Sequence, residues 1–375
     1  MPKVSVMIPS YNHEKYVGEA IESVLGQTFQ DFELIISDDC SPDDSAKVIS
    51  QYTDSRIRLH VFKKNVGATR NHEYCWSQCT GEYIALLNSD DVWEAEHLKE
   101  SVAYLDGHPA CGAVFSWASY MDENGEGDQH SAVVFKQPNR SRAQWLLQFY
   151  QQGNCLCHPS MVIRRVVYDH IGYYSRSLRQ LPDYDEWIRL VKKYDIHVIP
   201  KVTVHFRRTM RTMQNTSAPT KDNVVRDVAE SSYVLSHFFD DLDDELFAEA
   251  FRPLFRNPLA CTHEEYICER FFILLDNHYY IDNLSIPHAF FYFNNVYSQP
   301  GIAQVFEEKY QYTVSDFHEL GAKMDFLGLR TGDEAGFLMA DQNSAKHRLK
   351  ALAWAVFGKD TPIYDRLTRI FKGKL

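Results

Sequence analysis

The stretch Leu86-Leu87-Asn88-Ser89-Asp90-Asp91-Val92-Trp93 decides how the rest of the chain is interpreted. The apolar run over residues 83–87 indicates a short buried strand, which ends in two adjacent carboxylates before a helical pattern begins at Glu94. In open α/β sheets, ligands bind at the carboxyl ends of the strands, and acids there can hold a divalent cation against a phosphate. Two acids that only cap the next helix from a solvated loop would have the same sequence pattern. The segments around the neighbouring strands are therefore needed to distinguish a ligand site from helix capping.

Earlier segments repeat this order of strand, polar turn and helix. Residues 4–8, 32–36 and 57–61 are short apolar or alternating runs, which are typical of strands in a parallel sheet covered on both faces. Strand alternating with helix four times predicts a doubly wound, mostly parallel sheet of the α/β class. Because the carboxyl ends of parallel strands meet at one edge, the polar residues after the first, second and fourth strands are expected to share one site.

Length, charge and cysteine use narrow the class of protein. A chain of 375 residues favours two domains, and a net charge of −12 argues against nucleic-acid binding. The eight cysteines lack the two-residue spacing of zinc or thioredoxin pairs, which favours reduced thiols in a reducing compartment. Neither a signal-like segment after Met1 nor an apolar run of about 20 residues is found, so a cytoplasmic location is expected.

Five motifs occur in a recognisable order: residues 4–12, Asp38-Asp39-Cys40-Ser41-Pro42-Asp43, residues 65–71, Gly81-Glu82-Tyr83 and Ser89-Asp90-Asp91. Their order and spacing resemble glycosyltransferase family 2, a large inverting family whose fold is called GT-A. Further segments fit the same family, namely His158-Pro159-Ser160, Arg164-Arg165, Ile171-Gly172-Tyr173 and residues 183–189. The resemblance implies a GT-A catalytic domain that binds a nucleotide sugar over residues 1–217.

The resemblance assigns the nucleotide base to the turns after the first two strands. Pro9 and Tyr11 would line the base, with Tyr11 stacking on it, although an ordinary exposed turn aromatic would look alike. Asp39 would accept a hydrogen bond from the base N3–H, which favours a uridine or thymidine donor; helix capping is the alternative. Asp38 is expected to be structural.

The same resemblance implies a divalent metal, Mg²⁺ or Mn²⁺, beside the donor. Arg70 would contact the diphosphate or form a surface salt bridge, Asp90 would touch the ribose or the sugar, and Asp91 would bind the metal. The family often carries a further acid where this chain has Asn88. That departure leaves Asp91 as the expected metal ligand and the strength of metal dependence open.

Asp183 is the expected catalytic base, because inversion needs a group that takes the proton from the acceptor hydroxyl. The family pattern has Glu-Asp at this point, whereas this chain has Pro182-Asp183. Asp185 is a close competitor and Glu186 a remote one, and all of these acids could simply stabilise a helix N-terminus. His158 is expected to be a core histidine rather than an acceptor contact.

A third protein ligand for the metal is uncertain from the sequence. Relatives often carry an arginine followed two residues on by a metal-binding histidine, and this chain has Arg207, Arg208 and Arg211 but Thr209 in the place of that histidine. His205, or an arginine on the diphosphate, could substitute.

Residues 218–375 are expected to form a mainly α-helical C-terminal domain. Val224, Val225, Val228, Ala229, Tyr233 and Leu235 have roughly helical spacing, and further helices are expected near residues 244–252, 262–277, 301–310 and 315–327. Residues 346–375 combine apolar stripes with eight Lys or Arg against two Asp. This basic amphipathic segment could contact an anionic membrane surface or pack on the acidic body of the protein.

The sequence therefore favours an inverting, metal-assisted glycosyltransferase that moves a sugar from a UDP or dTDP sugar to a saccharide or lipid-linked saccharide. The expected process is the synthesis of a bacterial surface polysaccharide such as O-antigen or capsule. A sugar nucleotidyltransferase should have a glycine-rich phosphate loop after the first strand, where this chain has Pro9-Ser10-Tyr11-Asn12-His13. A catalytically idle sugar-binding or scaffold protein stays open because of Asn88 and Pro182. No Gly-x-Gly-x-x-Gly follows a strand, which argues against a Rossmann dehydrogenase.

Overall fold

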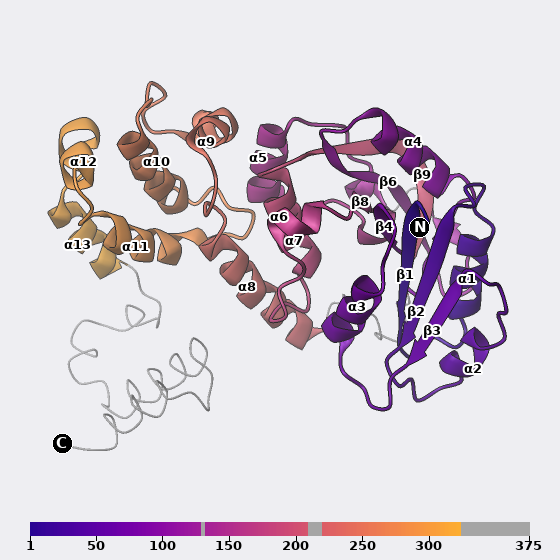
Figure 1. The fold of residues 1–375 in the computed structure, drawn as a ribbon. Helices are drawn as coiled ribbons and strands as arrows, with labels where there is room; N and C mark the ends of the chain where they lie inside the picture. Colours follow the sequence, from indigo (N-terminus) through magenta and orange to yellow (C-terminus); the bar gives the residue numbers. More distant parts are fainter. Residues whose placement is uncertain (129–131, 209–219, 324–375) are drawn as a thin grey trace, which may run out of the picture. The chain divides into compact units, whose positions relative to one another are not determined.

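The computed structural model describes residues 1–128, 132–208 and 220–323 (Figure 1). The chain divides into two compact units, Met1–Ile302 and Ala303–Leu375, and the second is described as far as residue 323.

A nine-stranded sheet forms the centre of the first unit, within the described residues. Its order is β3-β2-β1-β4-β8-β6-β9-β5, with β7 beside β6. The four strands from β3 to β4 are parallel, as predicted, whereas β8 runs antiparallel to both β4 and β6 and makes the second half of the sheet mixed. The strands are β1 (Val4–Ser10), β2 (Phe32–Asp38), β3 (Ile57–Val61), β4 (Tyr83–Leu86), β5 (Val92–Trp93), β6 (Cys111–Met121), β7 (Gly127–Asp128), β8 (Val162–Arg164) and β9 (Asp195–Arg207).

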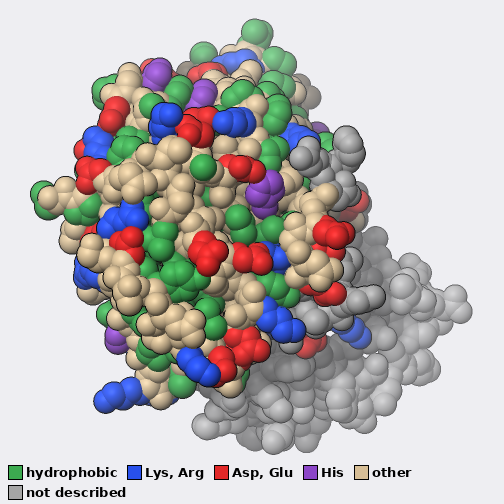
Figure 2. All heavy atoms as spheres, turned by 90° about the vertical axis from the view of Figure 1, so that its right-hand side faces the viewer, with side chains coloured by type: hydrophobic (Ala, Val, Ile, Leu, Met, Phe, Trp, Pro, Cys, Tyr) green, Lys and Arg blue, Asp and Glu red, His purple; other side chains and the backbone are tan. Residues whose placement is uncertain are grey.

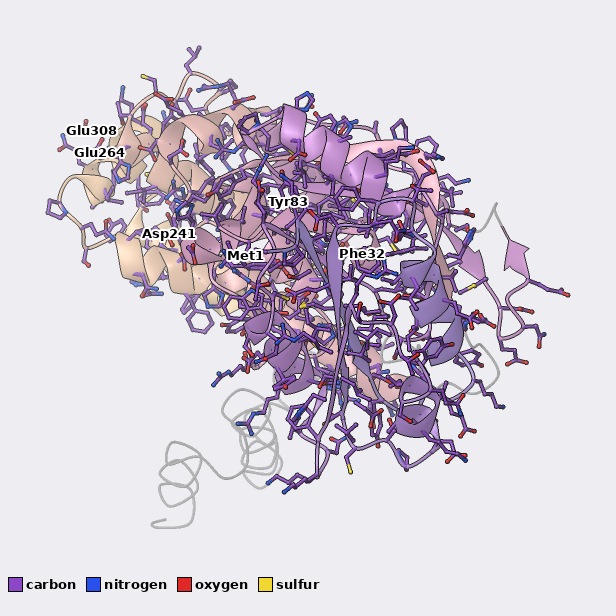
Figure 3. The ribbon with its side chains drawn as sticks, turned by 45° about the vertical axis from the view of Figure 1, so that its right-hand side comes forward. Met1, Phe32, Tyr83, Asp241, Glu264 and Glu308 are labelled. Atoms are coloured by element: carbon purple, nitrogen blue, oxygen red, sulfur yellow. The ribbon has the colours of Figure 1, made fainter. Side chains whose placement is uncertain are left out.

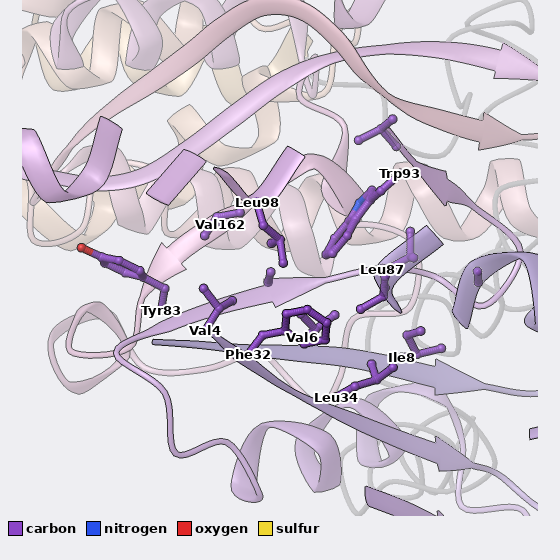
Figure 4. Close-up of a cluster of buried hydrophobic side chains, with 14 of the residues drawn as sticks. Val4, Val6, Ile8, Phe32, Leu34, Tyr83, Leu87, Trp93, Leu98 and Val162 are labelled. Carbon is purple, nitrogen blue, oxygen red and sulfur yellow. The ribbon is translucent and has the colours of Figure 1, made fainter. Parts of the chain in front are cut away.

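Helices on both sides of the parallel strands confirm the doubly wound α/β prediction: α1 (Val17–Leu25) and α2 (Ser45–Ile49) lie on one side and α3 (Ala68–Ser77) on the other (Figure 1). Alternate side chains of β1 are fully buried in a core that also contains one face of α1. Each fully buried Val, Leu or Ile contributes about 1.5–3 kcal/mol. The strand side of this core is drawn in Figure 4, where Val4, Val6, Ile8, Leu34 and Leu87 are labelled.

The segment after the acidic pair differs from its prediction. Val92 and Trp93 form β5, which pairs with β9 through Val92↔His205, and helix α4 (His97–Gly107) begins three residues later than the expected Glu94. Trp93 is buried, and its indole N–H donates to the Pro159 carbonyl at 2.7 Å. This tertiary pairing extends the chain before the helical pattern can begin.

The segment between β6 and β9 is mostly helical. It contains η1 (Val133–Phe135), α5 (Arg142–Gln152), the 3₁₀ turn η2 (His158–Ser160), α6 (Val167–Ile171) and α7 (Pro182–Val191). Helix α5 starts at a capping box of Ser141 and Gln144, and α7 starts with a proline at its first position. The predicted helical start at residues 184–190 is thereby confirmed.

The C-terminal region is mainly helical, as predicted. In the first unit it comprises α8 (Lys221–Ser236), α9 (Asp244–Phe251), η3 (Arg252–Leu254), α10 (His263–Leu275) and α11 (Ser285–Val296). The second unit contains α12, which spans Ile302–Tyr310, and α13 (Val314–Lys323). Within the described residues, no helix combines the length and apolar character that crossing a bilayer requires.

Two predictions fall outside the described part. The expected boundary between residues 217 and 218 lies within 209–219, so the division into 1–217 and 218–375 stays a prediction; by its contacts, α8 to α11 group with the sheet. The basic amphipathic segment 346–375 also lies outside the described residues.

Candidate active site

The carboxyl ends of β1, β2 and β4 lie at one edge of the sheet. Val4 pairs with Phe32 on one side and with Tyr83 on the other, so these residues mark the amino-terminal ends of the three strands (Figure 3). The turns that carry the predicted donor-binding residues follow the opposite ends. The sheet therefore brings these turns together, as the sequence led us to expect.

Hydrogen bonds join the turn after β1 to the two neighbouring turns. The backbone N–H groups of Asn12 and His13 donate to the hydroxyls of Ser41 and Ser45, each at 2.9 Å. The His13 Nδ1 atom lies 2.8 Å from the Ser89 hydroxyl, in the turn after β4. The three turns thus form one connected surface.

Asp38 and Asp39 have different tasks at the end of β2. Asp38 is fully buried and accepts hydrogen bonds from the backbone N–H and the hydroxyl of Ser41, at 2.8 and 2.6 Å, so it closes its own turn. Asp39 is 2% exposed and accepts from the N–H groups of Val66 and Gly67, at 2.6 and 2.9 Å. Because each carboxylate oxygen has a further lone pair, Asp39 holds the loop before α3 and retains acceptor capacity.

The other donor-side candidates present side chains that the protein itself leaves available. Tyr11 is 46% exposed on the turn after β1, and Pro9 is partly exposed opposite Ser37 of β2. Arg70 is exposed in the first turn of α3 and has no hydrogen bond or ion pair recorded with the described residues. An aromatic face, a proline and a cation are suited to a base and a phosphate.

Asp90 and Asp91 form an acidic pair in which Asp91 is buried and the Asp90 side chain is 14% exposed. Asp91 is 1% exposed and accepts from the Arg207 backbone N–H at 2.7 Å and from the Asn88 amide at 2.9 Å. The nearest oxygen of Asp90 lies 3.9 Å from the His13 Nε2 atom. Burial raises the pKa of both carboxyls, and the charge of Asp90 raises the pKa of Asp91 further. A cation at this pair would offset the unfavourable charge.

The buried Arg207 side chain fixes the backbone around this pair. Its guanidinium donates to the carbonyls of Asp90 and Asp122, at 2.8 and 3.0 Å, and pairs with Glu19 of α1. The end of β9 is thereby bonded to the turn after β4. Its neighbour Arg208 lies over the Tyr120 ring, 4.4 Å from the centroid.

The candidate metal-ligating side chains fit a metal ion that takes few protein ligands. Among the described residues, no group of three or more His, Cys, Asp or Glu is arranged to hold an ion. Both ring nitrogens of His205 have partners, at 2.8 Å from the Ser119 hydroxyl and 2.6 Å from Glu94, while Thr209 and Arg211 lie outside the described part. Magnesium is typically bound by one or two carboxylates together with substrate phosphates and water, which matches an Asp90–Asp91 pair.

Asp183 occupies the first turn of α7 and is held from two sides. One carboxylate oxygen accepts from the Tyr184 backbone N–H at 2.8 Å, and the other accepts from the Asn154 amide at 2.9 Å. Burial raises the pKa of Asp183 to about 6. Its competitor Asp185 instead forms an ion pair with Arg189 at 2.9 Å.

The thiol of Cys157 links the two acidic positions. It is buried, and burial raises its pKa well above the ordinary value, with further increases from the charges of Asp91 and Asp183. The segment that follows it contacts both regions: the Trp93 indole N–H, two residues after Asp91, donates to the Pro159 carbonyl at 2.7 Å, and the His158 ring lies 5.6 Å from the Trp187 ring of α7. The end of β4 and the start of α7 therefore converge.

Two remaining acid–base candidates are enclosed. The His158 ring bonds to the Tyr174 hydroxyl and stacks 6.2 Å from the His72 ring, and burial lowers its pKa to about 3, as for a core histidine. Glu186 is fully buried, and burial raises its pKa to about 8. Neither group is placed to take a proton from a bound substrate.

Neither His13 nor Asn154 was predicted to have a role. His13 adjoins a motif that was recognised, so its position after the first strand was the available signal. Asn154 lies in a segment without any local pattern, and its contact with Asp183 spans 29 residues.

A cavity of 370 Å³ lies elsewhere in the first unit. It is bordered by Asp185, Arg189 and Lys192 of α7 and by Tyr233 and His237 of α8. Of the residues considered for the site, Asp185 lines it, whereas Asp183 and the donor-side candidates do not. The spacing of its α7 residues places it on the side of that helix away from Asp183.

Comparison with known proteins identifies similar sequences. The Glycosyl transferase family 2 profile matches residues 5–172. The putative glycosyltransferase EpsE of Bacillus subtilis is 31% identical over 197 residues, which are 51% of this chain and 68% of that protein. The UDP-Glc:alpha-D-GlcNAc-diphosphoundecaprenol beta-1,3-glucosyltransferase WfgD of Escherichia coli is 29% identical over 198 residues, 52% of this chain and 72% of that protein.

A solved structure has a similar fold. Residues 1–349 of S. aureus TarS, in complex with UDP-GlcNAc, match with a TM-score of 0.50 and 17% identity, over 97% of this chain and 83% of that one. Against the longer TarS chain, this chain spans 48% of the length.

Proposed function

The chain belongs to glycosyltransferase family 2, and from this premise we propose that it is an inverting transferase that moves a sugar from a UDP or dTDP sugar to a saccharide hydroxyl. One observation carries the proposal. The connected turns after β1, β2 and β4 present Tyr11, Asp39 and the Asp90–Asp91 pair. Residues 157–160 contact both Trp93, just after that pair, and Trp187 of α7, the helix whose first turn carries Asp183.

The donor would lie along the connected turns. Tyr11 would stack on the base beside Pro9, and Asp39 would accept the base N3–H through a lone pair that the 66–67 loop leaves available. Arg70 would contact the diphosphate, and Asp90 the ribose or the sugar. The UDP sugars named for WfgD and TarS support a uridine donor.

Asp91, with Asp90 beside it, would hold Mg²⁺ or Mn²⁺. A divalent ion there would neutralise charge on the departing diphosphate, an effect of several kcal/mol. Arg207 would keep the pair in place through its bonds to the Asp90 carbonyl and, by its backbone N–H, to the Asp91 carboxylate.

Asp183 would act as the base. Its ionised carboxylate would take the proton of the acceptor hydroxyl while that oxygen bonds to the anomeric carbon, and the bond from this carbon to the nucleoside diphosphate would break on the opposite face. The configuration at the carbon would be inverted. The Asn154 amide would hold the carboxylate oxygen in position during the transfer.

The acceptor would be a saccharide or lipid-linked saccharide of bacterial surface polysaccharide, O-antigen or capsule. The diphosphoundecaprenol acceptor in the name of WfgD supports this class. The enzyme would be cytoplasmic and peripheral on the inner face of the cell membrane, with the basic residues 346–375 at the anionic surface. On the face drawn in Figure 2, the described acidic and basic side chains are interspersed.

A thermal-shift panel of nucleoside diphosphates with Mn²⁺ tests the proposal. Because a ligand that prefers the folded state raises the melting temperature, UDP or dTDP should give the largest increase. UDP release from UDP-glucose and UDP-GlcNAc, with water as the acceptor, then tests for catalysis. Binding of UDP with no release from any donor would indicate a catalytically idle sugar-binding protein instead.

A further inference from the structure

Glu230 of α8 binds the backbone that leads into α7. Its side chain is only 7% exposed, and its carboxylate accepts hydrogen bonds from three consecutive backbone N–H groups, those of Arg179, Gln180 and Leu181, at 2.9, 2.7 and 3.0 Å. The next two residues are Pro182 and Asp183. A single carboxylate, about 50 residues later in the chain, thus fixes the segment that carries the candidate base.

The start of α7 has no cap of its own. Leu181 stands at the N-cap position and offers no side-chain acceptor. Pro182 has no N–H group, and the Tyr184 N–H donates to the Asp183 carboxylate. Glu230 instead binds the three N–H groups that lead into the helix, the last of them that of Leu181. Hydrogen bonds to an ionised carboxylate are shorter and about twice as strong as those between neutral groups, so α8 holds the N-cap residue of α7.

Two neighbours of Glu230 strengthen this connection. The Gln180 amide donates to the Asn223 side chain of α8 at 3.3 Å. Asp227, one turn before Glu230, contributes charge to the environment of Asp183, and burial and the charge of Glu230 together raise the pKa of Asp227. The same face of α8 thus holds the backbone and shapes the electrostatics of Asp183.

We propose that Glu230 is a positioning residue that sets the place of Asp183 in the reaction, so that α8 forms a working part of the transferase site. This inference rests on the proposed function, because it takes Asp183 as the base. Glu230 does not touch the substrate in this account. It acts by fixing the 179–181 backbone, on which the direction of the Asp183 carboxylate depends.

The titratable groups that face Asp183 come from several elements. They are Asp227 on α8, Glu186 on α7, the Cys157 thiol before η2, and Tyr174 between α6 and α7. A displaced Asp183 carboxylate would leave this enclosed environment and become better hydrated. Its pKa would then fall towards the ordinary aspartate value.

The test compares Glu230→Gln and Glu230→Asp with the control Asp222→Asn, an exposed acid on the same helix. The probe is UDP release from UDP-glucose and UDP-GlcNAc with Mn²⁺, measured from pH 4.5 to 8. A displacement of the base by about 1 Å can cost about 100-fold, so we expect kcat to fall about 10- to 100-fold in both Glu230 variants. The donor KM and the UDP-induced thermal shift should not change, and the acidic limb of the pH profile should move below pH 6.

Unchanged kcat and an unchanged pH profile in both Glu230 variants would overturn the inference, as would a fall in kcat accompanied by an equal loss of the UDP-induced shift. If Glu230→Gln fails to fold, the charge-retaining Glu230→Asp decides. The Asp183→Asn variant distinguishes a failure of the proposed catalytic base from a failure of the proposal for Glu230. Wild-type release by Asp183→Asn would defeat the proposed base, whereas an inactive Asp183→Asn beside fully active Glu230 variants would defeat this inference alone.

Discussion

The donor side and the base side of the proposed site are built in different ways. On the donor side, Asp39 directly follows β2 and the Asp90–Asp91 pair lies in the turn after β4, and the parallel strands bring both turns to one edge. On the base side, Asp183 depends on Asn154 and on Glu230, which are 29 residues before it and 47 after it, outside any local motif. The donor side can therefore be predicted from the sequence, whereas the base side depends on tertiary packing.

The largest expected effect is on the base side. Asp183→Asn should lower the rate of UDP release about 100- to 10,000-fold, the usual contribution of a general base, because an amide cannot take the proton. The UDP-induced thermal shift should be retained. Asp185→Asn is the matched control, since Asp185 is paired with Arg189 and should matter far less. Equal losses in the two variants would contradict the assignment.

The donor side is tested by Asp91→Ala. Loss of the carboxylate should lower the rate about 100-fold or more, because a metal contributes several kcal/mol, and should remove the part of the UDP-induced thermal shift that needs Mn²⁺. Titration of Mn²⁺ at fixed UDP checks this. If the variant keeps full Mn²⁺ dependence, Asp91 in the turn after β4 does not bind the metal.

The pH dependence of UDP release tests the ionisation of Asp183 on the base side. Burial raises the pKa of Asp183 to about 6, so the carboxyl is mostly protonated at pH 5 and mostly ionised at pH 7. A base works only when ionised, and the rate of UDP release should therefore rise about 10-fold between pH 5 and pH 7. The profile of kcat against pH measures this, and a flat profile below pH 6 would argue against Asp183.

Asp39→Asn should have a smaller effect than either acid above. The amide has one oxygen where the carboxylate has two, so one of the N–H groups of Val66 and Gly67 loses its acceptor. We expect UDP affinity to fall about 10-fold, since one charge-assisted hydrogen bond contributes roughly 1.5–3 kcal/mol. Calorimetric titration with UDP checks the value. Undiminished affinity would show that Asp39 serves only the loop.

The last prediction concerns stability and leaves catalysis aside. Burial raises the pKa of Glu186 to about 8, above its unfolded value, so the folded state holds this proton over the range from about pH 4.5 to 8. The free energy of unfolding must then fall as pH rises through that range, by up to about 1.4 kcal/mol per pH unit. Glu186→Gln should flatten the dependence of the melting temperature on pH. An equally steep dependence in the variant would place the proton elsewhere.

Local sequence patterns predicted the strands that short apolar runs between turns are enough to define. The runs at residues 4–8, 32–36, 57–61 and 83–87 became β1 to β4, because short apolar segments between turns have few alternatives. β5 was missed, since Val92 and Trp93 are extended only by pairing with β9, more than a hundred residues later. α11 was missed too, although Ala289, Phe293 and Val296 are buried in it.

For helix α8, residue spacing predicted the helix but not which of its faces is buried. Its helical character was predicted from Val224, Val225 and Val228, yet these side chains are 54%, 63% and 40% exposed. The buried face instead carries Glu230, Ser231, Val234 and Leu235. A buried carboxylate is stable only where donors meet it, and those donors belong to residues 179–181. Spacing alone does not reveal such a partner.

The most direct test of the account is a crystal structure with UDP and Mn²⁺ bound. We expect uracil beside Tyr11 and Asp39, Mn²⁺ between Asp91 and the diphosphate, and Asp183 facing the same opening. Nucleotide bound in the 370 Å³ cavity on the other side of α7, or Asp183 turned away from the bound diphosphate, would contradict it.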